Sequence, residues 1–406
     1  MNNRSVLVSL GIIGLCVTVI GCQEAVGLEL AWSVRQGLVG QWGVQGNEIF
    51  TVGRYLAVHD LLTGREVRRA RLPQDYANTT LGQIGPEIAI TDSVLAFGWY
   101  DLEMKGKVLC FDAKTLALRW ERVFTWSWDV RDTRPTFSVV TDGDYVYALA
   151  IGKEGENLFK LKLTDGQTMW SKNIEKYVQG VPLILHDGKL LIRSRVSRHA
   201  RDPYGYYRAV SADTGVDLWK VRIDGKALVR DDQPLISGDR TYLTSEASSP
   251  DEYHLYTVDI GTGKIFDHVQ LRQTGAPFAE IDGVLYLGGS TPMAYKLSRQ
   301  ETIWQTALRG PEGFGLNVSA KGILDLRRGE IYLGDWDRDL YVLSAKTGQV
   351  KEKLYIRGYL RGELLSPLKA FFGSYGVERL ALVQGLLFVG TVDKSLFVFR
   401  RVDKNY

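Results

Sequence analysis

The chain has 406 residues, 45% of them hydrophobic and 24% charged, which is typical of a globular protein with a sizeable core. Its formal net charge is only +3, so no global field favours nucleic acid as a partner. Aromatic residues make up 11% of the chain, which favours β-strands, and a propeller or barrel of this length can remain a single domain.

Residues 1–21 have the features of an export signal. A short, weakly basic head containing Arg4 precedes the apolar run Val6–Ile20. This run is too short for a comfortable transmembrane helix, which needs about 20 apolar residues. We therefore expect the segment to be removed and the protein to be exported.

The signal ends at Val19-Ile20-Gly21-Cys22, which resembles the bacterial lipobox, where the Cys is acylated and becomes the new N-terminus. We predict lipidation at Cys22, followed by a short linker over 22–28. The protein is then expected to sit on a membrane by its lipid anchor, facing the periplasm or the cell exterior. A plain signal peptide with an incidental Cys is the alternative.

Cysteine usage agrees with this interpretation. Cys16 lies in the removed segment and Cys22 would carry lipid, so Cys110 alone remains and no intramolecular disulfide is expected. Cys110 lies in the apolar run Val108–Phe111, which predicts a buried, inert thiol.

A corner motif recurs along the mature chain. An apolar strand is followed by Asp-x-Thr-Gly or a relative, and in most copies Trp stands four residues beyond the Gly position. The spacing is 49 residues from Gly166 to Gly215 and 48 from Gly215 to Gly263, which matches a four-stranded propeller blade. The seven corners are Asp60–Gly64, Asp112–Leu116, Leu163–Gly166, Ser211–Gly215, Asp259–Gly263, Leu297–Gln300 and Ser344–Gly348.

A second series of tight turns falls between these corners. Each turn is flanked by alternating apolar residues, which is a strong hairpin signal because two-residue turns need φ > 0. The eight turns are Gln45-Gly46, Thr91-Asp92, Asp142-Gly143, Asp187-Gly188, Gly238-Asp239, Asp282-Gly283, Arg328-Gly329 and Gln384-Gly385. One blade is thus strand A, turn, strand B, loop, strand C, corner and strand D.

The eight turns outnumber the seven corners by one, and the two ends of the chain supply the missing strand pair. Ser395–Arg400 is a C strand with no D strand after it, and Leu30–Val34 is a D strand with no blade before it. Pairing them closes the ring and removes two exposed sheet edges. We predict an all-β, eight-bladed β-propeller of four-stranded antiparallel blades over residues 29–406, with Trp32, Trp120, Trp170, Trp219 and Trp304 packing between blades.

The segment Leu340–Gly348, with Gly334–Asp337 ahead of it, looks like the repeat of pyrroloquinoline-quinone-type propellers. Together with the lipobox and eight blades, it resembles the lipoprotein propeller subunits of the machinery that assembles outer-membrane β-barrel proteins. The resemblance implies a non-enzymatic scaffold that docks onto an envelope protein through loops on one face. No docking residue is carried over, because no motif beyond the repeat aligns. We expect a monomer.

Candidate metal sites are weak. The five His residues are assigned to separate blades, which disfavours a zinc site: His59, His186, His199, His254 and His268. Asp335, Asp337 and Asp339 alternate as Ca²⁺ ligands can, but Asp337 falls at a B–C turn and no Glu follows at a suitable distance. A turn is therefore the preferred interpretation.

Two alternative functions remain open. One is a quinone- or small-molecule-binding propeller, although the chain lacks the adjacent Cys-Cys pair of many quinoprotein dehydrogenases and has no identifiable Ca²⁺ cluster. The other is an extracytoplasmic sensor or carbohydrate-binding module. The blade repeat alone specifies no cofactor, so we expect none.

Four lengthened loops interrupt the repeat over blades two to five. They are the D–A connection Phe124–Arg134 and the B–C loops Tyr100–Gly106, Arg193–Arg208 and Glu246–His254. Loops of these two kinds emerge on the same face of a propeller, and Arg, Tyr and Trp dominate binding hot spots. We predict partner binding by Trp126, Trp128, Arg131, Arg193, Arg195, Arg198, Tyr204 and Tyr206, with a solvated, mobile set of loops as the alternative.

Overall fold

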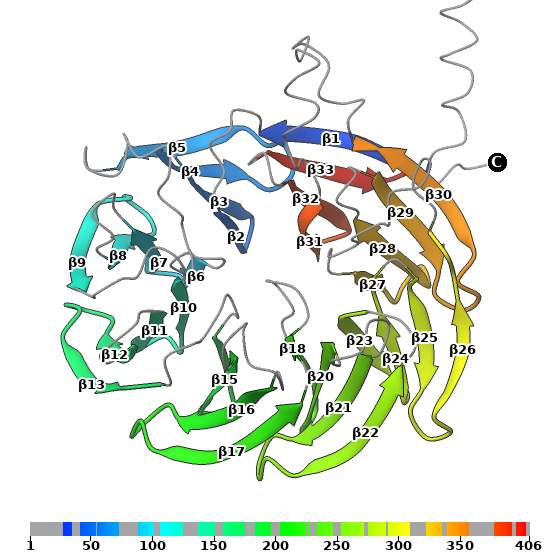
Figure 1. Ribbon diagram of the computed structural model, residues 1–406. Helices are drawn as coiled ribbons and strands as arrows, with labels where there is room; N and C mark the ends of the chain where they lie inside the picture. Colours follow the sequence, from blue (N-terminus) through cyan, green and yellow to red (C-terminus); the bar gives the residue numbers. More distant parts are fainter. Residues whose placement is uncertain are drawn as a thin grey trace, which may run out of the picture.

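Antiparallel hairpins form the regular structure of the described chain, which the computed structural model gives as 33 strands and no helix. The described ranges are 27–34, 41–53, 55–72, 88–100, 106–124, 137–150, 157–174, 183–195, 204–224, 226–227, 234–246, 253–271, 275–289, 291–308, 322–334, 339–356, 377–391 and 395–402. The strands fall into eight sheets arranged as a ring (Figure 1). The predicted eight-bladed propeller is therefore confirmed.

The first four blades follow the chain order A to D. Blade one is β2 (Gln41–Gln45), β3 (Glu48–Val52), β4 (Tyr55–Asp60) and β5 (Glu66–Arg71). Blade two is β6 (Ile88–Ile90), β7 (Val94–Tyr100), β8 (Gly106–Asp112) and β9 (Leu118–Phe124). Blade three is β10 (Phe137–Thr141), β11 (Tyr145–Ala150), β12 (Leu158–Lys162) and β13 (Thr168–Lys172). Blade four is β14 (Ile184–His186), β15 (Lys189–Arg195), β16 (Tyr204–Ser211) and β17 (Asp217–Asp224).

The remaining blades continue this order, with one additional short strand in blade five. Blade five is β18 (Lys226–Ala227), β19 (Leu235–Ser237), β20 (Arg240–Glu246), β21 (Tyr253–Asp259) and β22 (Ile265–Leu271). Blade six is β23 (Pro277–Ile281), β24 (Val284–Leu287), β25 (Met293–Lys296) and β26 (Glu301–Gln305). Blade seven is β27 (Ile323–Asp325), β28 (Glu330–Gly334), β29 (Asp339–Ser344) and β30 (Val350–Tyr355). Blade eight is β31 (Val377–Val383), β32 (Leu386–Thr391), β33 (Leu396–Arg401) and β1 (Leu28–Val34).

Blade eight closes the ring with strands from both ends of the chain. β1 pairs antiparallel with β33, and the register places Trp32 opposite Val398 and Ser33 opposite Phe397. Figure 1 shows β1 (blue) lying beside β33 (red). The predicted closure is confirmed, and it leaves β33 with a hydrogen-bonded neighbour on each side.

The apolar core lies in the wedges between consecutive blades. The described residues form eight buried clusters, and each one joins two neighbouring blades. At the closure, for example, Trp32 and Trp42 pack against Phe388, and their ring centroids lie 6.2 and 5.6 Å, respectively, from the Phe388 centroid. Cys110 is fully buried in the cluster between blades two and three, and this burial raises the pKa of its thiol to about 12. The prediction of a buried thiol is confirmed.

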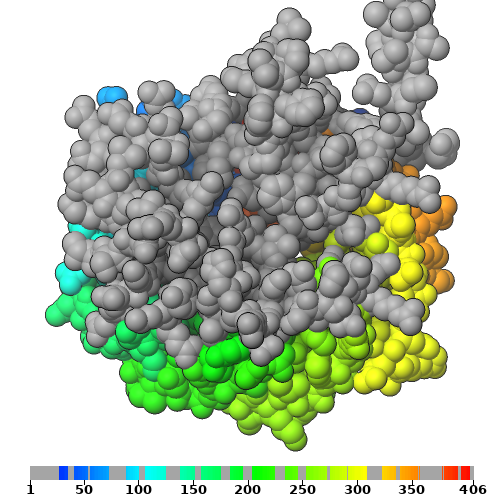
Figure 2. All heavy atoms as spheres, viewed as in Figure 1, coloured from blue at the N-terminus to red at the C-terminus, as the bar shows by residue number. Residues whose placement is uncertain are grey.

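The D strands form the outer wall of the ring, which Figure 2 shows in green, yellow and orange for blades four to seven. Their side chains alternate between partly buried and exposed positions, as in β22, because each D strand is the outermost strand of its sheet. Single large apolar residues such as Met169 and Leu218 are exposed along this wall.

Candidate functional site

Antiparallel connectivity gives the ring two different faces. The A–B turns and C–D corners lie together at one end of each blade, where Leu61 N–H donates to Asn47 O, and we call this end the turn face. The last residues of the B and D strands lie at the opposite end of each blade, which we call the loop face. Several predicted residues of the loop-face rim lie outside the described residues, as does the predicted lipid site: Trp126, Trp128, Arg131, Arg198 and Cys22.

The segment 193–208, predicted as a B–C loop, is strand at both of its ends, over 193–195 and 204–208, and this corrects the prediction. β15 extends to Arg195, whose backbone pairs with Gly205, and β16 begins at Tyr204. Arg193 is only 4% exposed, and its Nη2 donates to the carbonyl oxygen of Thr244 on β20. Alternate residues of β15 and β16, such as Leu191 and Tyr207, are buried at the junction with blade five. This burial favours pairing of the two strands as far as Arg195 and Gly205. Arg193 thus connects two blades and does not extend from the rim.

Tyr204 and Tyr206 belong to a compact group of aromatic and charged side chains. Their ring centroids lie 5.7 Å apart, edge to face. Lys220 Nζ lies 3.7 Å from the Tyr206 centroid, and the Arg222 guanidinium lies 4.2 Å from that of Tyr204. Arg222 Nε also pairs with Asp224 at 2.7 Å. We call these five residues the blade-four cluster; cation–π contacts orient it at the loop-face end of β16 and β17.

The two tyrosines of this cluster were predicted from the sequence, but their cationic partners were not. The register places Tyr206 opposite Arg222 and Arg208 opposite Lys220. The signal was available in principle, since β17 alternates charged and apolar residues. However, the exact cross-strand alignment depends on a bulge between Ala209 and Val210.

The assignment of the five His residues to separate blades is wrong for two of them. His254 on β21 and His268 on β22 belong to blade five, and the His268 Nε2 and His254 Nδ1 atoms lie 2.8 Å apart. The Tyr256 ring stacks on His268 with centroids 4.4 Å apart. Burial, followed by the neighbouring His254, lowers the pKa of His268. The two His residues meet because the register places His268 opposite Tyr256, which lies two residues beyond His254 on β21.

The described residues contain no group of three His, Cys, Asp or Glu side chains arranged to hold a metal ion. Residues 335–338 of the candidate Ca²⁺ loop lie outside the described residues. Asp339 is buried, and its carboxylate pairs with Lys353 Nζ at 2.7 Å.

On the turn face, five blade junctions are closed by the same pair of residues. The D-strand Trp packs on the corner Gly of the next blade and donates its indole N–H to a corner carbonyl, as Trp120 does to Leu163 O at 2.8 Å. A Cβ on Gly166 would lie 2.7 Å from the Trp120 ring, and φ there is +71°, so glycine is required. The pairs are Trp32–Gly64, Trp120–Gly166, Trp170–Gly215, Trp219–Gly263 and Trp304–Gly348. The predicted inter-blade packing of these Trp residues is confirmed.

Two corners have no glycine, and the D strand facing each of them has no Trp. Leu116, with φ +58°, faces Arg68, whose Nη2 reaches Ala113 O at 3.4 Å, where the other junctions have an indole N–H. Gln300, with φ +53°, faces Asp267, and its Nε2 donates to both carboxylate oxygens at 3.2 Å. A corner Cβ and an indole would compete for the same space, which explains why glycine and Trp occur together.

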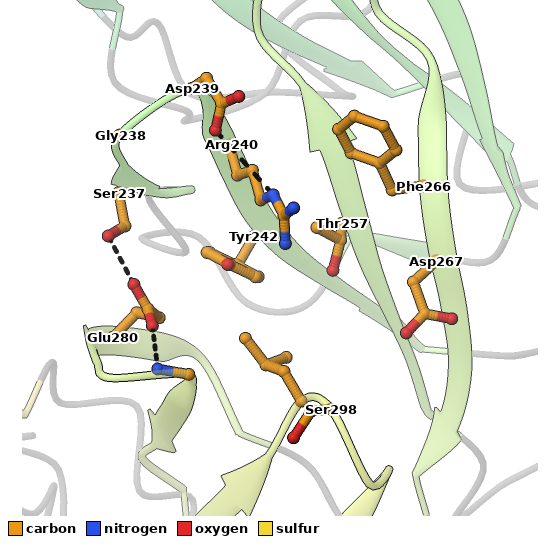
Figure 3. Close-up of a pocket in the computed structure, with 12 residues that line it drawn as sticks. Ser237, Gly238, Asp239, Arg240, Tyr242, Thr257, Phe266, Asp267, Glu280 and Ser298 are labelled. Atoms are coloured by element: carbon orange, nitrogen blue, oxygen red, sulfur yellow. Dashed lines mark hydrogen bonds and ion pairs between the residues drawn. The ribbon is translucent and has the colours of Figure 1, made fainter.

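The second of these junctions contains an open cleft of about 550 Å³ between blades five and six. Figure 3 shows Glu280 on one side and Asp267 on the other, with Arg240, Tyr242 and Thr257 between them. This cleft was not predicted from the sequence. Its only sequence signal is Asp at position 267, four residues beyond Gly263, where Trp stands in most copies of the repeat.

Local bonds hold the charged groups of the cleft in place. Glu280 accepts hydrogen bonds from the Ser237 hydroxyl and the Gly283 N–H, each at 2.7 Å. Arg240 lies 5.2 Å from the Phe266 centroid, and its Nε lies 3.9 Å from Asp239 Oδ1. The cleft therefore presents oriented carboxylates beside an aromatic ring.

Comparisons with known proteins agree with this architecture. The family model for the outer membrane protein assembly factor BamB matches residues 154–363, which is half of the chain. The chain belongs to the BamB family. No curated protein matches the chain. The crystal structure of BamB from Moraxella catarrhalis is similar, with a TM-score of 0.63, 18% identity, and coverage of 92% of this chain and 99% of that one.

Propellers outside the BamB family share the fold. A europium-containing methanol dehydrogenase aligns with a TM-score of 0.57 and 13% identity over 92% of this chain and 93% of its own. A quinohemoprotein alcohol dehydrogenase from Comamonas testosteroni aligns with a TM-score of 0.58 and 12% identity over 94% and 77%. At these identities the similarity concerns the fold alone, so the function has to be argued from the site.

Proposed function

We propose that this BamB-family propeller is a non-enzymatic scaffold of the cell envelope that binds a protein partner through the loop face of blades two to five. Membership of the family supports a binding role, since its model describes an outer membrane protein assembly factor. A component of the β-barrel assembly machinery is thus the partner class that we expect.

The observation that carries this proposal is the blade-four cluster. Tyr204 and Tyr206 keep part of their surface exposed, and the side chains of Lys220 and Arg222 lie over their rings. Rings held in this way lose little conformational entropy on binding, and Tyr and Arg are enriched among hot spots. The predicted residues Trp126, Trp128, Arg131, Arg195 and Arg198 would extend this surface along the rim.

The test is a pull-down from detergent-solubilised envelope with Trp128, Arg198, Tyr204 and Tyr206 replaced together by Ala. We expect partner recovery to fall at least tenfold, because each hot-spot residue contributes about 2 kcal/mol or more. The matched control replaces four exposed turn-face residues, Leu62, Asp187, Arg299 and Leu326, and should recover the partner normally. Equal recovery by both variants would rule out this rim.

We further propose that acylation of Cys22 anchors the protein to a membrane. No helix within the described residues is long and apolar enough to cross a membrane. Each buried CH₂ of an acyl chain contributes about 0.8 kcal/mol, so several chains hold a protein firmly at the surface.

Replacing Cys22 with Ser is expected to move the protein from the membrane fraction to the soluble fraction of lysed cells and to abolish incorporation of labelled palmitate. The Cys110→Ser variant is the control and should remain membrane-bound and labelled, because Cys110 is buried in the propeller core. Palmitate labelling that persists in the Cys22 variant would exclude this anchor.

A further inference from the structure

The cleft between blades five and six occupies a position that the protein fills at other junctions with a planar side chain. Asp267 pairs with Thr257 at the register position where Trp219 pairs with Ala209 and Arg68 pairs with Val58. Indole rings take this position at five junctions, and a guanidinium takes it between blades one and two. At the blade five–six junction the shorter Asp267 leaves the space open to solvent.

The occupant at the blade one–two junction indicates what chemistry this position accommodates. Arg68 places its guanidinium there and forms two hydrogen bonds with the Glu48 carboxylate, at 2.7 Å each. A planar cation therefore fits between a D strand and the next corner when a carboxylate faces it. In blade five the register position of Glu48 is taken by Arg240, and the carboxylates of the cleft come instead from Asp239, Asp267 and Glu280, with no planar cation at the Trp position.

The charge of the lining favours a cationic ligand. Three carboxylates, those of Asp239, Asp267 and Glu280, line the cleft together with one cation, Arg240. Glu280 and Asp267 are held by hydrogen bonds from Ser237, Gly283 and Gln300. The acceptors are thus oriented before any ligand arrives, which lowers the entropy that binding has to overcome.

A buried hydroxyl at the same junction also lacks a partner. Tyr295 on β25 is 3% exposed, and its hydroxyl has no hydrogen-bond partner among the described residues. Burial, followed by the charge of Asp267, raises the pKa of Tyr295. A buried polar group without a partner is unusual in a folded protein, and this one lies in the apolar cluster of the junction that holds the cleft.

We propose that this cleft is a second binding site, and that it takes the arginine side chain of a polypeptide. The guanidinium would lie beside the corner of blade six, as that of Arg68 lies beside the Leu116 corner of blade two, opposite Asp267 and with its alkyl stem against Phe266 and Leu297. The cleft is on the turn face, so it is independent of the loop-face rim proposed above. The scaffold would then be able to hold one polypeptide on each face.

The experiment uses the full chain and the peptide acetyl-Gly-Arg-Gly-amide, observed by saturation-transfer difference NMR. We expect transfer to the arginine stem protons. The signal should be at least tenfold weaker for the peptide with citrulline, which keeps the planar shape but has no charge. It should also be weaker for the lysine peptide, whose ammonium has no planar fork. Equal signals from arginine and citrulline, or from arginine and lysine, would overturn the proposal.

Two variants locate the site. Asp267→Trp combined with Gln300→Gly recreates the residue pair of the five closed junctions and should abolish the arginine signal. Asp267→Asn keeps the size of the side chain, removes its charge, and should weaken the signal at least tenfold. If the double variant does not fold, as judged by its thermal transition, the Asn variant decides. Unchanged binding in a folded variant would refute the assignment of this cleft.

Discussion

Replacing Arg401 with Met is expected to lower the free energy of unfolding by about 3–5 kcal/mol, the usual loss when one partner of a buried ion pair is removed. Arg401, on β33, pairs with both Glu330 on β28 and Glu352 on β30. Its side chain is 16% exposed, and those of the two carboxylates are 5% and 7% exposed. The variant would leave two buried carboxylates without this cation at the junction of blades seven and eight.

This junction is where the ring closes, since Leu28 N–H of β1 also donates to Glu352 Oε1 at 3.3 Å. Unfolding in urea measures the loss. Arg400→Met is the matched control, because Arg400 is the adjacent residue, is 62% exposed and lies 3.8 Å from Glu29. It should change stability by less than about 1 kcal/mol. Equal midpoints for the two variants would contradict a structural role for the buried pair.

A double variant distinguishes the loss of charge pairing from the loss of side-chain packing. Adding Glu352→Gln to the Arg401→Met variant removes the charge of one of the two carboxylates that lost this cation, while the other, Glu330, still pairs with Lys351 Nζ at 3.1 Å. Part of the lost stability should return, because a neutral amide is far less unfavourable to bury than an unpaired carboxylate. If the double variant is less stable than Arg401→Met alone, lost packing and not charge explains the effect.

Replacing Gly64 with Ala is expected to lower stability by about 2–5 kcal/mol. The left-handed backbone accounts for about 1–2 kcal/mol, because φ is +66°. Overpacking accounts for about 1–3 kcal/mol more, because the new Cβ would lie 2.4 Å from the Trp32 ring. Thermal or urea unfolding checks the value.

Gly46 provides the matched control in the same blade. Its φ is +57°, but a Cβ there would meet nothing within 4 Å, so Gly46→Ala should lose only the backbone contribution. The decisive arm is a double-mutant cycle with Trp32→Ala, in which the penalty at Gly64 should fall to that at Gly46. A penalty at Gly64 that is independent of Trp32 would show that the ring is not the obstacle.

The pairing of Trp with Gly also explains the irregular copies of the repeat. Leu116 and Gln300 occupy left-handed corner positions where glycine is usual. In both cases the facing D-strand residue, Arg68 or Asp267, is not Trp. Two apparently degenerate copies thus follow the same steric rule as the five regular ones.

Much of the architecture could be predicted because it is encoded locally and repeatedly. A two-residue turn needs φ > 0 whatever surrounds it, and alternation of apolar residues identifies a strand without knowledge of its neighbours. The closure of β1 on β33 was also predictable, since the counts of turns and corners left one unpaired strand at each end. Even the fully buried Cys110 was apparent from its apolar run.

The surfaces were harder to predict. The approach of His254 to His268, the cations over Tyr204 and Tyr206, and the connection of Arg193 to Thr244 all depend on cross-strand register or on packing between blades. A bulge of one residue shifts such neighbours, and nothing local in the sequence marks the angle at which one blade meets the next. The cleft at Asp267 was hard to predict for the same reason. Its position is defined by comparison with the tryptophans of other junctions, and that comparison requires the packing between blades to be known.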